Sequence, residues 1–451
     1  MRWTVSRRFA ISILFVLIEI CAWGRTRPHY GGTIHVEIAG DPWERPSGVA
    51  RRLVYDGLTQ FDSFGSLQSS LAVSWEQDNS YHRWQFRLRP GVRFHDGTAL
   101  TSATVIASLN ASCSAHCPWD AVKAVGSLVI FTNDSPMPTL PSLLASDQFL
   151  IALTSTAGAS STVGVGTGPF QVNGFTNGVL ALIAYENSWS GRPFADAIEV
   201  RVHRAVRDQW LDLSLGRADV VEVPAEQLRQ AQQQRLSLHT SPPVSLLALL
   251  LRDDGALANV KVRAAIAASV DRSSIYNVIF QKQGEATASL LPARMSGYAF
   301  LFPTDRDLNK AHELRGGLGT TSLTMSVEGD GAVQLAAQRI SLNLREAGFN
   351  VQTVPAGTQR ADVVLRTLSI AGDDPAAALE RLLWDAGVPA PVTEQLPDAL
   401  YKQEKAILDS RRIIPLLDLP MAYANGARLR DLRLRADATP DLAYASLEDT
   451  R

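Results

Sequence analysis

The run VSLLALLL at residues 244–251 constrains the fold more than any other feature, because seven of its eight side chains are apolar. Such a run is typical of a strand that is buried on both of its faces. The spacing of apolar residues after it predicts one long helix over residues 262–280. Farther along, the patterns predict strands at 322–329, 350–356 and 361–368 and helices at 331–347, 376–386 and 400–410. The second half of the chain therefore predicts α/β units built on a sheet.

The first half is richer in strand patterns. Residues 83–89, RWQFRLR, alternate strictly, so that Trp84, Phe86 and Leu88 share one face of a strand. Turn signals follow at Pro90-Gly91 and Asp96-Gly97. Further strand patterns occupy residues 31–38, 122–131, 179–185 and 197–203, with a helix near 205–216. We therefore expect an α/β protein whose first half contains a strand-rich portion.

Size and charge exclude several classes of protein. The 451 residues are enough for two or three domains at about 150 residues each. With 43 basic and 45 acidic residues the net charge is −2, so no overall positive field exists that would hold nucleic acid. No stretch reaches the roughly 18 apolar residues that a membrane-spanning helix needs. The composition predicts a water-soluble protein.

The N-terminus has the features of an export signal. Arg2, Arg7 and Arg8 precede an apolar run over residues 9–18, and small residues follow at 22–24. We expect residues 1–24 to be a signal peptide that is removed near Arg25. A lipidated Cys21 and a twin-arginine signal are weaker alternatives, because Ile20 is bulky and no spacer residue follows the arginine pair.

Export changes the interpretation of the cysteines. The mature chain would keep Cys113 and Cys117, and an oxidising compartment favours their pairing. We expect a disulfide between them, closing a short loop. The alternative is a metal site that also uses His116, but no second cluster of ligands completes it.

No catalytic motif is present in the sequence. GxSxG, HExxH, Walker A and EF-hand patterns are absent, and the eight histidines are scattered. No nucleophile and base can be assembled for a secreted hydrolase. We expect a protein that is not an enzyme and that needs neither a cofactor nor a metal.

An ordered series of sequence blocks carries a family resemblance. LAVSWEQD at 71–78 and FRLRPGVRFHDGTALT at 86–101 resemble the signature of the family 5 extracellular solute-binding proteins, the oligopeptide, dipeptide and nickel group. Matching blocks follow the same order along the mature chain: GGT at 31–33, LVYDGLTQFD at 53–62, GTGPF at 166–170, RADVVEVP at 217–224, VKVRAAIAASVDRSSI at 260–275, LLP at 290–292 and IIPLLDLPMAYA at 413–424.

The resemblance implies a two-lobed clamshell, with mixed β-sheets flanked by helices and a strand-rich subdomain in the first lobe. Similar proteins are periplasmic, and they deliver a small or peptide-like ligand to an ABC permease. We expect a monomer that meets the membrane only through that permease. The implied limits are 25–243 for the N-terminal lobe (subdomain about 56–162), 244–415 for the C-terminal lobe and 416–451 for the return segment. The alternative is the same clamshell presented to a membrane signalling receptor.

One departure from the family bears on the ligand. Many peptide-binding relatives place a Trp, an Asp and an aromatic residue shortly before an acidic-Pro pair, and that Asp binds the free amine of the peptide. Here Asp374-Pro375 matches the pair, while the three positions hold Leu368, Ala371 and Gly372. The resemblance therefore implies that the amine anchor is missing, although Asp373 could approach.

Four residues are candidates for the ligand site: Trp43, Arg252, Arg366 and Asp373. Arg252 follows the apolar run of residues 244–251, at a strand end where cleft residues collect. A guanidinium there could bind a carboxylate through two hydrogen bonds. The competing interpretation is a surface arginine paired with Asp253 or Asp254.

Overall fold

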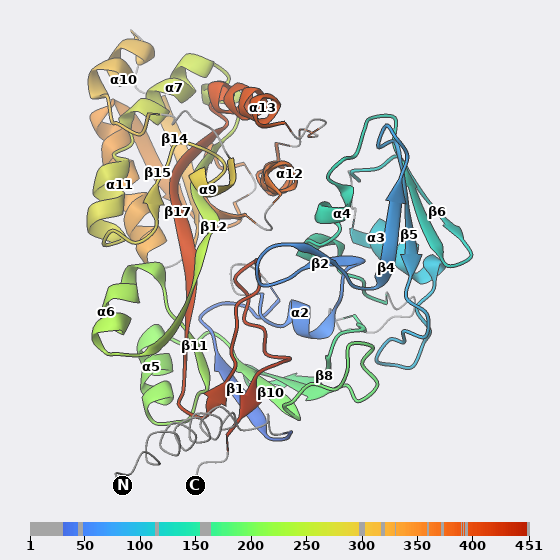
Figure 1. Cartoon of the computed structure of the whole chain (residues 1–451). Coiled ribbons are helices and arrows are strands. Elements are labelled where there is room, and N and C mark those ends of the chain that lie inside the picture. Colours follow the sequence, from blue (N-terminus) through green and yellow to red (C-terminus); the bar gives the residue numbers. More distant parts are fainter. Residues whose placement is uncertain are drawn as a thin grey trace, which may run out of the picture.

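The computed structural model has two lobes joined by long strands (Figure 1). It describes residues 30–448, except 44–47, 113–116, 154–163, 297–302, 317–320, 330, 359, 371–373, 389, 391 and 393–395. The expected signal peptide therefore lies outside the described residues. Within the described part of the chain, no helix is both long and apolar enough to cross a lipid bilayer.

An eleven-stranded mixed sheet runs through both lobes. Its order is β15-β14-β16-β12-β17-β11-β1-β10-β9-β8, and β13 pairs with β17 at one side. The long strands β12 (Ser237–Leu251) and β17 (Ile413–Asn425) lie antiparallel at its centre. We call these two the connecting strands, because β12 pairs with β16 on one side while β17 pairs with β11 on the other.

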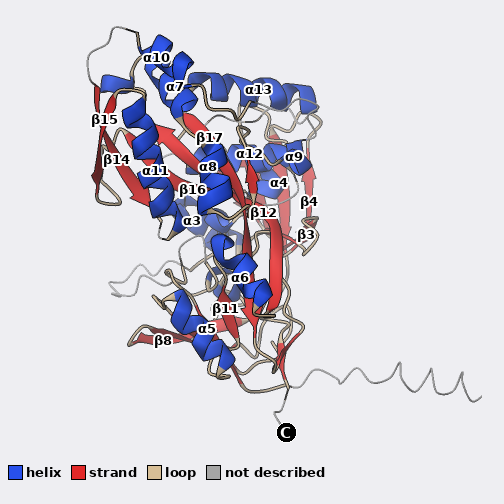
Figure 2. Cartoon of the chain, turned by 90° about the vertical axis from the view of Figure 1, so that its left-hand side faces the viewer, coloured by secondary structure: helices blue, strands red, loops and turns tan. Residues whose placement is uncertain are grey.

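The C-lobe lies on the β15 side of the connecting strands. Its strands are β13 (Glu285–Ala286), β14 (Thr321–Glu328), β15 (Phe349–Val354) and β16 (Val363–Ser369). Helices α7 (Val260–Ser269), α10 (Leu308–Arg315) and α11 (Ala332–Glu346) cover one face. Helices α9 (Ala293–Ser296), α12 (Pro375–Asp385) and α13 (Pro397–Ser410) cover the other (Figures 1 and 2).

The burial of β12 explains its apolar sequence. Leu247 and Leu249 belong to the core under α7 and α11, whereas Leu246 and Ala248 belong to the core under α12 and α13. All four side chains are completely buried. Because successive side chains of a strand point to opposite faces, a strand covered on both faces needs an unbroken apolar run. The prediction of a doubly buried strand is confirmed.

The N-lobe lies on the β8 side. It contains β1 (Thr33–Glu37), β8 (Phe170–Thr176), β9 (Val179–Ala184), β10 (Ala197–Arg201), β11 (Val220–Glu222), α2 (Arg51–Val54), α5 (Val206–Ser214) and α6 (Leu228–Gln233). The C-terminal return segment, with β18 (Leu429–Arg430) and β19 (Ser446–Leu447), packs into the same core. Helices α5 and α6 pack against β11 and β17, on the side of the sheet where α11 lies in the C-lobe (Figures 1 and 2).

A strand-rich subdomain extends the N-lobe. Its sheet has the order β4-β5-β7-β6 and is covered by α3 (Ser102–Ser112). Trp84, Phe86 and Leu88 all point into its core, as the alternation predicts. Gly91 and Gly97 have positive φ values of 77° and 86°, which only glycine adopts readily. The strands are β4 (Ala72–Gln77), β5 (Arg83–Leu88), β6 (Ala121–Val125) and β7 (Leu128–Thr132).

The single helix expected over residues 262–280 is wrong. Helix α7 ends at Ser269, Val270 is extended, and a new turn α8 (Arg272–Ser274) leads into a π-helical segment, Ile275–Ile279. The Asp271 side chain accepts a hydrogen bond from the backbone N–H of Ser274 at 2.9 Å and so caps the new turn. Buried Arg272 donates to the carbonyl of Pro415 on β17 at 2.8 Å, which holds the break against the sheet.

Candidate functional site

A cavity of about 440 Å³ lies where the two lobes meet the connecting strands. Residues 238–242 and Val244 of β12 form its floor, and residues 434–436 of the return segment line it from the N-lobe. The turn between β2 (Thr59–Phe61) and β3 (Leu67–Ser69) adds residues 63–65, and α9 of the C-lobe adds Arg294. This volume is in the range of small-molecule sites. We call this space the interlobe cavity.

The β2–β3 turn holds an aromatic ring at the edge of the interlobe cavity. One oxygen of the Asp62 carboxylate accepts hydrogen bonds from the backbone N–H groups of Phe64 and Ser66, both at 2.9 Å. Gly65 completes the turn with a φ of 84°. The turn is therefore ordered, yet 84% of Phe64 is exposed to solvent.

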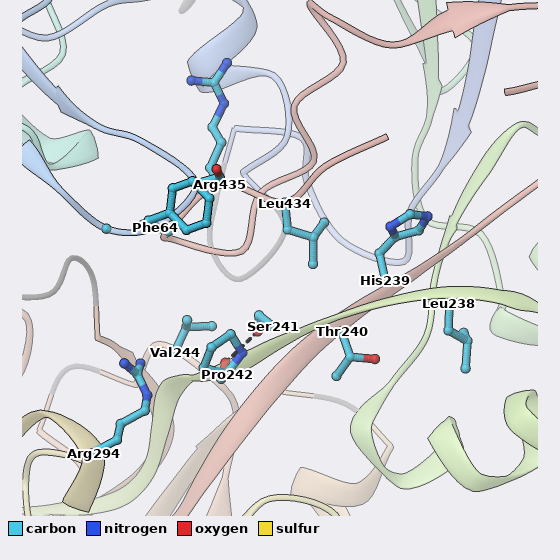
Figure 3. Close-up of a pocket in the computed structure, with 13 residues that line it drawn as sticks. Phe64, Leu238, His239, Thr240, Ser241, Pro242, Val244, Arg294, Leu434 and Arg435 are labelled. Carbon is cyan, nitrogen blue, oxygen red and sulfur yellow. Dashed lines mark hydrogen bonds between the residues drawn. The ribbon is translucent and has the colours of Figure 1, made fainter. Parts of the chain in front are cut away.

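Arg294 approaches the interlobe cavity from the opposite lobe (Figure 3). Its helix α9 is anchored by Leu290, Leu291 and Met295 in the C-lobe core. The guanidinium donates to the carbonyl of Pro243 on β12 at 2.8 Å. Because Pro243 follows Pro242, this stretch of β12 carries two residues without an N–H donor, and the β12–β17 register shifts there.

A buried acid lies near enough to Arg294 for their charges to interact. Burial raises the pKa of the Asp418 carboxyl on β17 to about 8, and the negative charges of Glu285 and Glu404 add to the effect. Arg294 and a hydrogen bond from Thr287 oppose this rise but do not cancel it. Near neutral pH the Asp418 side chain is therefore mostly protonated.

A second cavity of about 440 Å³ lies inside the N-lobe, next to the interlobe cavity. Its charged lining residues are three arginines and three aspartates: Arg52, Arg433, Arg435, Asp56, Asp62 and Asp441. Several of these charges have partners within the protein. Arg435 donates to Asp441 at 2.8 Å, Arg52 lies 2.9 Å from Asp147, and Trp189 donates to Asp56 at 2.8 Å. This cavity therefore has a balanced set of charges.

Direct contacts between the lobes involve α12 and the short helix α4 (Leu140–Leu143) of the subdomain. Thr139 donates to Glu380 at 2.8 Å, and Ser142 donates to Asp374 at 3.2 Å. Arg381 donates to Ser146 at 2.9 Å. Burial raises the pKa of Glu380 to about 7, against the hydrogen bonds from Thr139 and the backbone of Val392.

Three of the four residues proposed from the sequence are described by the structure, and none of these three lines the interlobe cavity. Trp43 packs against the N-lobe core with its ring centroid 6.1 Å from that of Tyr55. Arg252 is paired with Asp254, the partner that the surface interpretation names. Arg366 lies on β16, 3.4 Å from the Glu328 carboxylate. Asp373 lies outside the described residues.

The expected disulfide is not formed at Cys117, which the structure records as a free, half-buried cysteine. Its predicted partner, Cys113, lies outside the described residues, as does His116 of the alternative metal site. Within the described part of the chain, no three His, Cys, Asp or Glu side chains are grouped to hold a metal ion.

Sequence reasoning missed Phe64 and Arg294. Phe64 lies in DSFGS at 62–66, where Asp62 and Gly65 favour a turn. A large apolar residue at the tip of such a turn is a sequence signal of an exposed apolar side chain. Arg294 directly follows the LLP block and Ala293. About 50 residues of chain separate Arg294 from the β12 residue that it contacts, so the sequence does not reveal this contact.

Comparisons with known proteins agree with this architecture. The family model for "Bacterial extracellular solute-binding proteins, family 5 Middle" matches residues 66–387, well over half of the chain. Oligopeptide-binding protein AppA of Bacillus subtilis is 22% identical over 341 residues, which cover 66% of this chain and 62% of AppA. Heme-binding protein A of Haemophilus influenzae is 23% identical over 54% of this chain and 52% of its own length. The chain thus spans little more than half of the length of these curated relatives.

A solved structure extends the similarity across both lobes. The periplasmic binding protein DppA of Helicobacter pylori, in complex with the peptide STSA, superposes with a TM-score of 0.80. The match covers 93% of this chain and 99% of that chain at 17% sequence identity, so it establishes the fold alone. With the family match, the two-lobed fold and the cavity between the lobes, the chain belongs to the bacterial extracellular solute-binding proteins of family 5.

Proposed function

We propose that the protein is an exported receptor that captures a small organic solute in the interlobe cavity and delivers it to an ABC permease. The observation that carries this proposal is the composition of the cavity wall. Residues 63–65 and 434–436 come from the N-lobe, Arg294 comes from the C-lobe, and β12 connects the two. A ligand in this position touches both lobes at once.

Lobe closure follows from that geometry. A ligand that contacts both lobes binds the closed arrangement better than an open one, and it shifts the population accordingly. The α4–α12 contacts form only when the lobes meet, so they add to the stability of the closed state. A permease that recognises the closed arrangement would then distinguish loaded from empty receptor.

The cellular setting belongs to the same proposal. Residues 1–24 direct export and are removed, and the mature protein works as a monomer in the periplasm. Residues 25–243 form the N-terminal lobe, 244–415 the C-terminal lobe and 416–451 the return segment. The protein binds its ligand without changing it chemically.

Native mass spectrometry of gently purified protein tests the proposal. We expect a bound small molecule, released by unfolding, whose mass matches no modification of the chain. Added back to stripped protein, that molecule should raise the melting temperature in a concentration-dependent way. Protein that retains no molecule and is stabilised by none of a broad solute panel would contradict the proposed function.

A further inference from the structure

We propose that the cavity inside the N-lobe extends the interlobe cavity and receives one end of an elongated, neutral, hydroxyl-rich ligand, namely a short oligosaccharide. We call this second space of about 440 Å³ the N-lobe cavity. The inference rests on the proposed function and specifies the class of ligand. Three features carry it: the boundary between the two cavities, the aromatic rings of the N-lobe cavity and the partners of its polar side chains.

The two cavities share part of their lining. Ser63, from the turn between β2 and β3, and Leu434 and Arg435, from the return segment, line both of them. In Figure 3, Leu434 and Arg435 lie across the interlobe cavity from Pro242 of β12. Each cavity has a volume of about 440 Å³, which is in the range of small-molecule sites. This arrangement suits a ligand that is longer than one cavity and occupies both.

Aromatic rings at the two cavities suit the apolar C–H faces of sugar rings. Trp189 of the N-lobe cavity is held in place, because its Nε1 donates to Asp56 at 2.8 Å and the Arg89 guanidinium lies 4.7 Å from the centroid of its ring. Tyr444, from the return segment, also lines the N-lobe cavity and is 55% exposed. Phe64 lies at the interlobe cavity. A ligand that covers these rings removes apolar surface from water.

The charges of the N-lobe cavity favour a neutral ligand. Among the described residues that line it, three arginines balance three aspartates. Arg435 donates to Asp441 at 2.8 Å, and Arg52 lies 2.9 Å from Asp147. Arg433 is exposed, so that water and salt screen its charge. Balanced charges give no net field that attracts an anion or a cation, and a neutral ligand avoids the cost of taking a charge out of water.

The polar side chains of the N-lobe cavity suit hydroxyl groups. Oδ2 of Asp56 accepts from Thr167 and from Trp189, both at 2.8 Å, whereas its Oδ1 has no hydrogen-bond partner among the described residues. Gln60 and Gln68 add amide groups, which donate as well as accept. A hydroxyl also donates and accepts, and it rotates to meet either kind of group. A wall that mixes donors, acceptors and aromatic rings therefore matches a sugar.

Titration calorimetry with sugars of increasing length tests the inference. The probes are glucose, the cellobiose and maltose series up to the tetrasaccharides, raffinose and any molecule that the gently purified protein retains. Tetrapeptides with both ends blocked are neutral comparison probes of similar length. We expect the best tri- or tetrasaccharide to bind about tenfold or more tightly than its monosaccharide, because only the longer sugar occupies both cavities. Tyr444→Ala should weaken the longer sugar by about three- to tenfold.

A pair of tryptophan variants in one turn tests whether the ligand passes between the cavities. Ser63→Trp places a large ring where the cavities adjoin, whereas Ser66→Trp places it at an exposed residue of the same turn that lines neither cavity. We expect Ser63→Trp to weaken the tetrasaccharide by about tenfold or more and Ser66→Trp to leave its affinity unchanged. Tyr30→Ala is the control for Tyr444→Ala, because Tyr30 is 63% exposed and lines neither cavity.

The outcomes separate this inference from the proposed function. Equal affinity of the longest sugar for Tyr444→Ala, Ser63→Trp and the unchanged protein would overturn the inference and leave the solute-binding function intact. A retained ligand without hydroxyl groups, or blocked peptides that bind more tightly than every sugar, would do the same. Failure of every probe, together with the absence of a retained molecule, contradicts both.

Discussion

At the scale of single residues, the buried environment of Asp418 favours the neutral form of its carboxyl. It is 1% exposed on a connecting strand, and burial raises its pKa from 3.8 to about 8. In the unfolded chain it ionises near its ordinary value. Between pH 4 and pH 8 the folded state therefore binds more protons at this group than the unfolded state does, and folding stability falls as the pH rises through that window.

Asp418→Asn should remove this pH dependence. The amide is neutral at every pH, so we expect the variant to be more stable than the unchanged protein at pH 8, with a smaller difference at pH 5. The slope that disappears should be at most about 1.4 kcal/mol per pH unit. Urea unfolding at pH 5, 6, 7 and 8 measures it. The exposed Asp253→Asn is the matched control, and an unchanged slope in Asp418→Asn would show that the carboxyl ionises without cost.

The identity of Leu368 leads to a prediction about the affinity for free peptides. By the family resemblance, Leu368 and Ala371 hold the sequence positions of the Trp and the amine-binding Asp of many peptide-binding relatives. Leu368 is 1% exposed in the C-lobe core. A buried ammonium without a paired carboxylate costs several kcal/mol. We expect free di- to pentapeptides to bind at about millimolar concentration or worse. N-acetylation should leave their affinity unchanged or improve it in calorimetry, and a strong loss on acetylation would refute this expectation.

At the scale of elements, we expect the contact of α12 with α4 to couple lobe closure to protonation of Glu380. With α4 against α12, burial raises the pKa of the Glu380 carboxyl to about 7, and Asp374 contributes to that rise. We expect separation of the lobes to take Thr139 and the rest of α4 away from Glu380, so that water reaches the carboxyl and its pKa moves toward the ordinary value of 4.5. Closing therefore takes up protons between about pH 4.5 and pH 7, so that closure becomes less favourable as the pH rises through this range.

Glu380→Gln should abolish that dependence, because its amide oxygen still accepts from Thr139 and carries no charge. Small-angle scattering of ligand-free protein at pH 5 and pH 8 measures it. We expect a smaller radius of gyration at pH 5 in the unchanged protein and no pH effect in the variant. Glu346→Gln, at an exposed acid paired with Arg306 in the C-lobe, should behave like the unchanged protein.

The segment that enters β8 depends on a glycine for space. A Cβ added at Gly166 would lie 1.8 Å from the carbonyl oxygen of Val54, so Gly166→Ala must displace the backbone. We expect a loss of about 2–3 kcal/mol in the free energy of unfolding. Gly426→Ala, where the nearest atom would lie at 3.3 Å, should cost clearly less. Denaturant titration compares the two, and equal losses would contradict the steric argument.

At the scale of the whole molecule, we expect the lobes to move by bending of the connecting strands. β12 and β17 carry a register shift at Pro243, and the Ser241 hydroxyl accepts from the backbone N–H of Met421 beside it. Bending at this point would move the two walls of the interlobe cavity relative to each other, because they belong to different lobes. A saturating ligand should lower the radius of gyration of the stripped protein, whereas a ligand that raises the melting temperature without changing the radius would count against closure.

Local patterns in the sequence predict the class of fold and most of its elements. The apolar run of β12 and the alternation of Trp84, Phe86 and Leu88 depend on local periodicity, and both are confirmed. Local patterns were insufficient where a distant partner intervenes. The break at Asp271 is held by Arg272 on Pro415, a contact across more than 140 residues of chain, and no helical periodicity can reveal it.

The residues of the candidate site come together only through long-range contacts of the fold. Arg252 lies at a strand end and has a guanidinium that could bind a carboxylate, but the Asp254 carboxylate, two residues away, is already bound to it. Arg294, Phe64 and the return segment have no common sequence signal, because they come from three distant parts of the chain and meet only where the lobes face each other. A family and a fold follow from ordered local patterns, whereas a binding surface between lobes depends on which distant side chains the fold brings together.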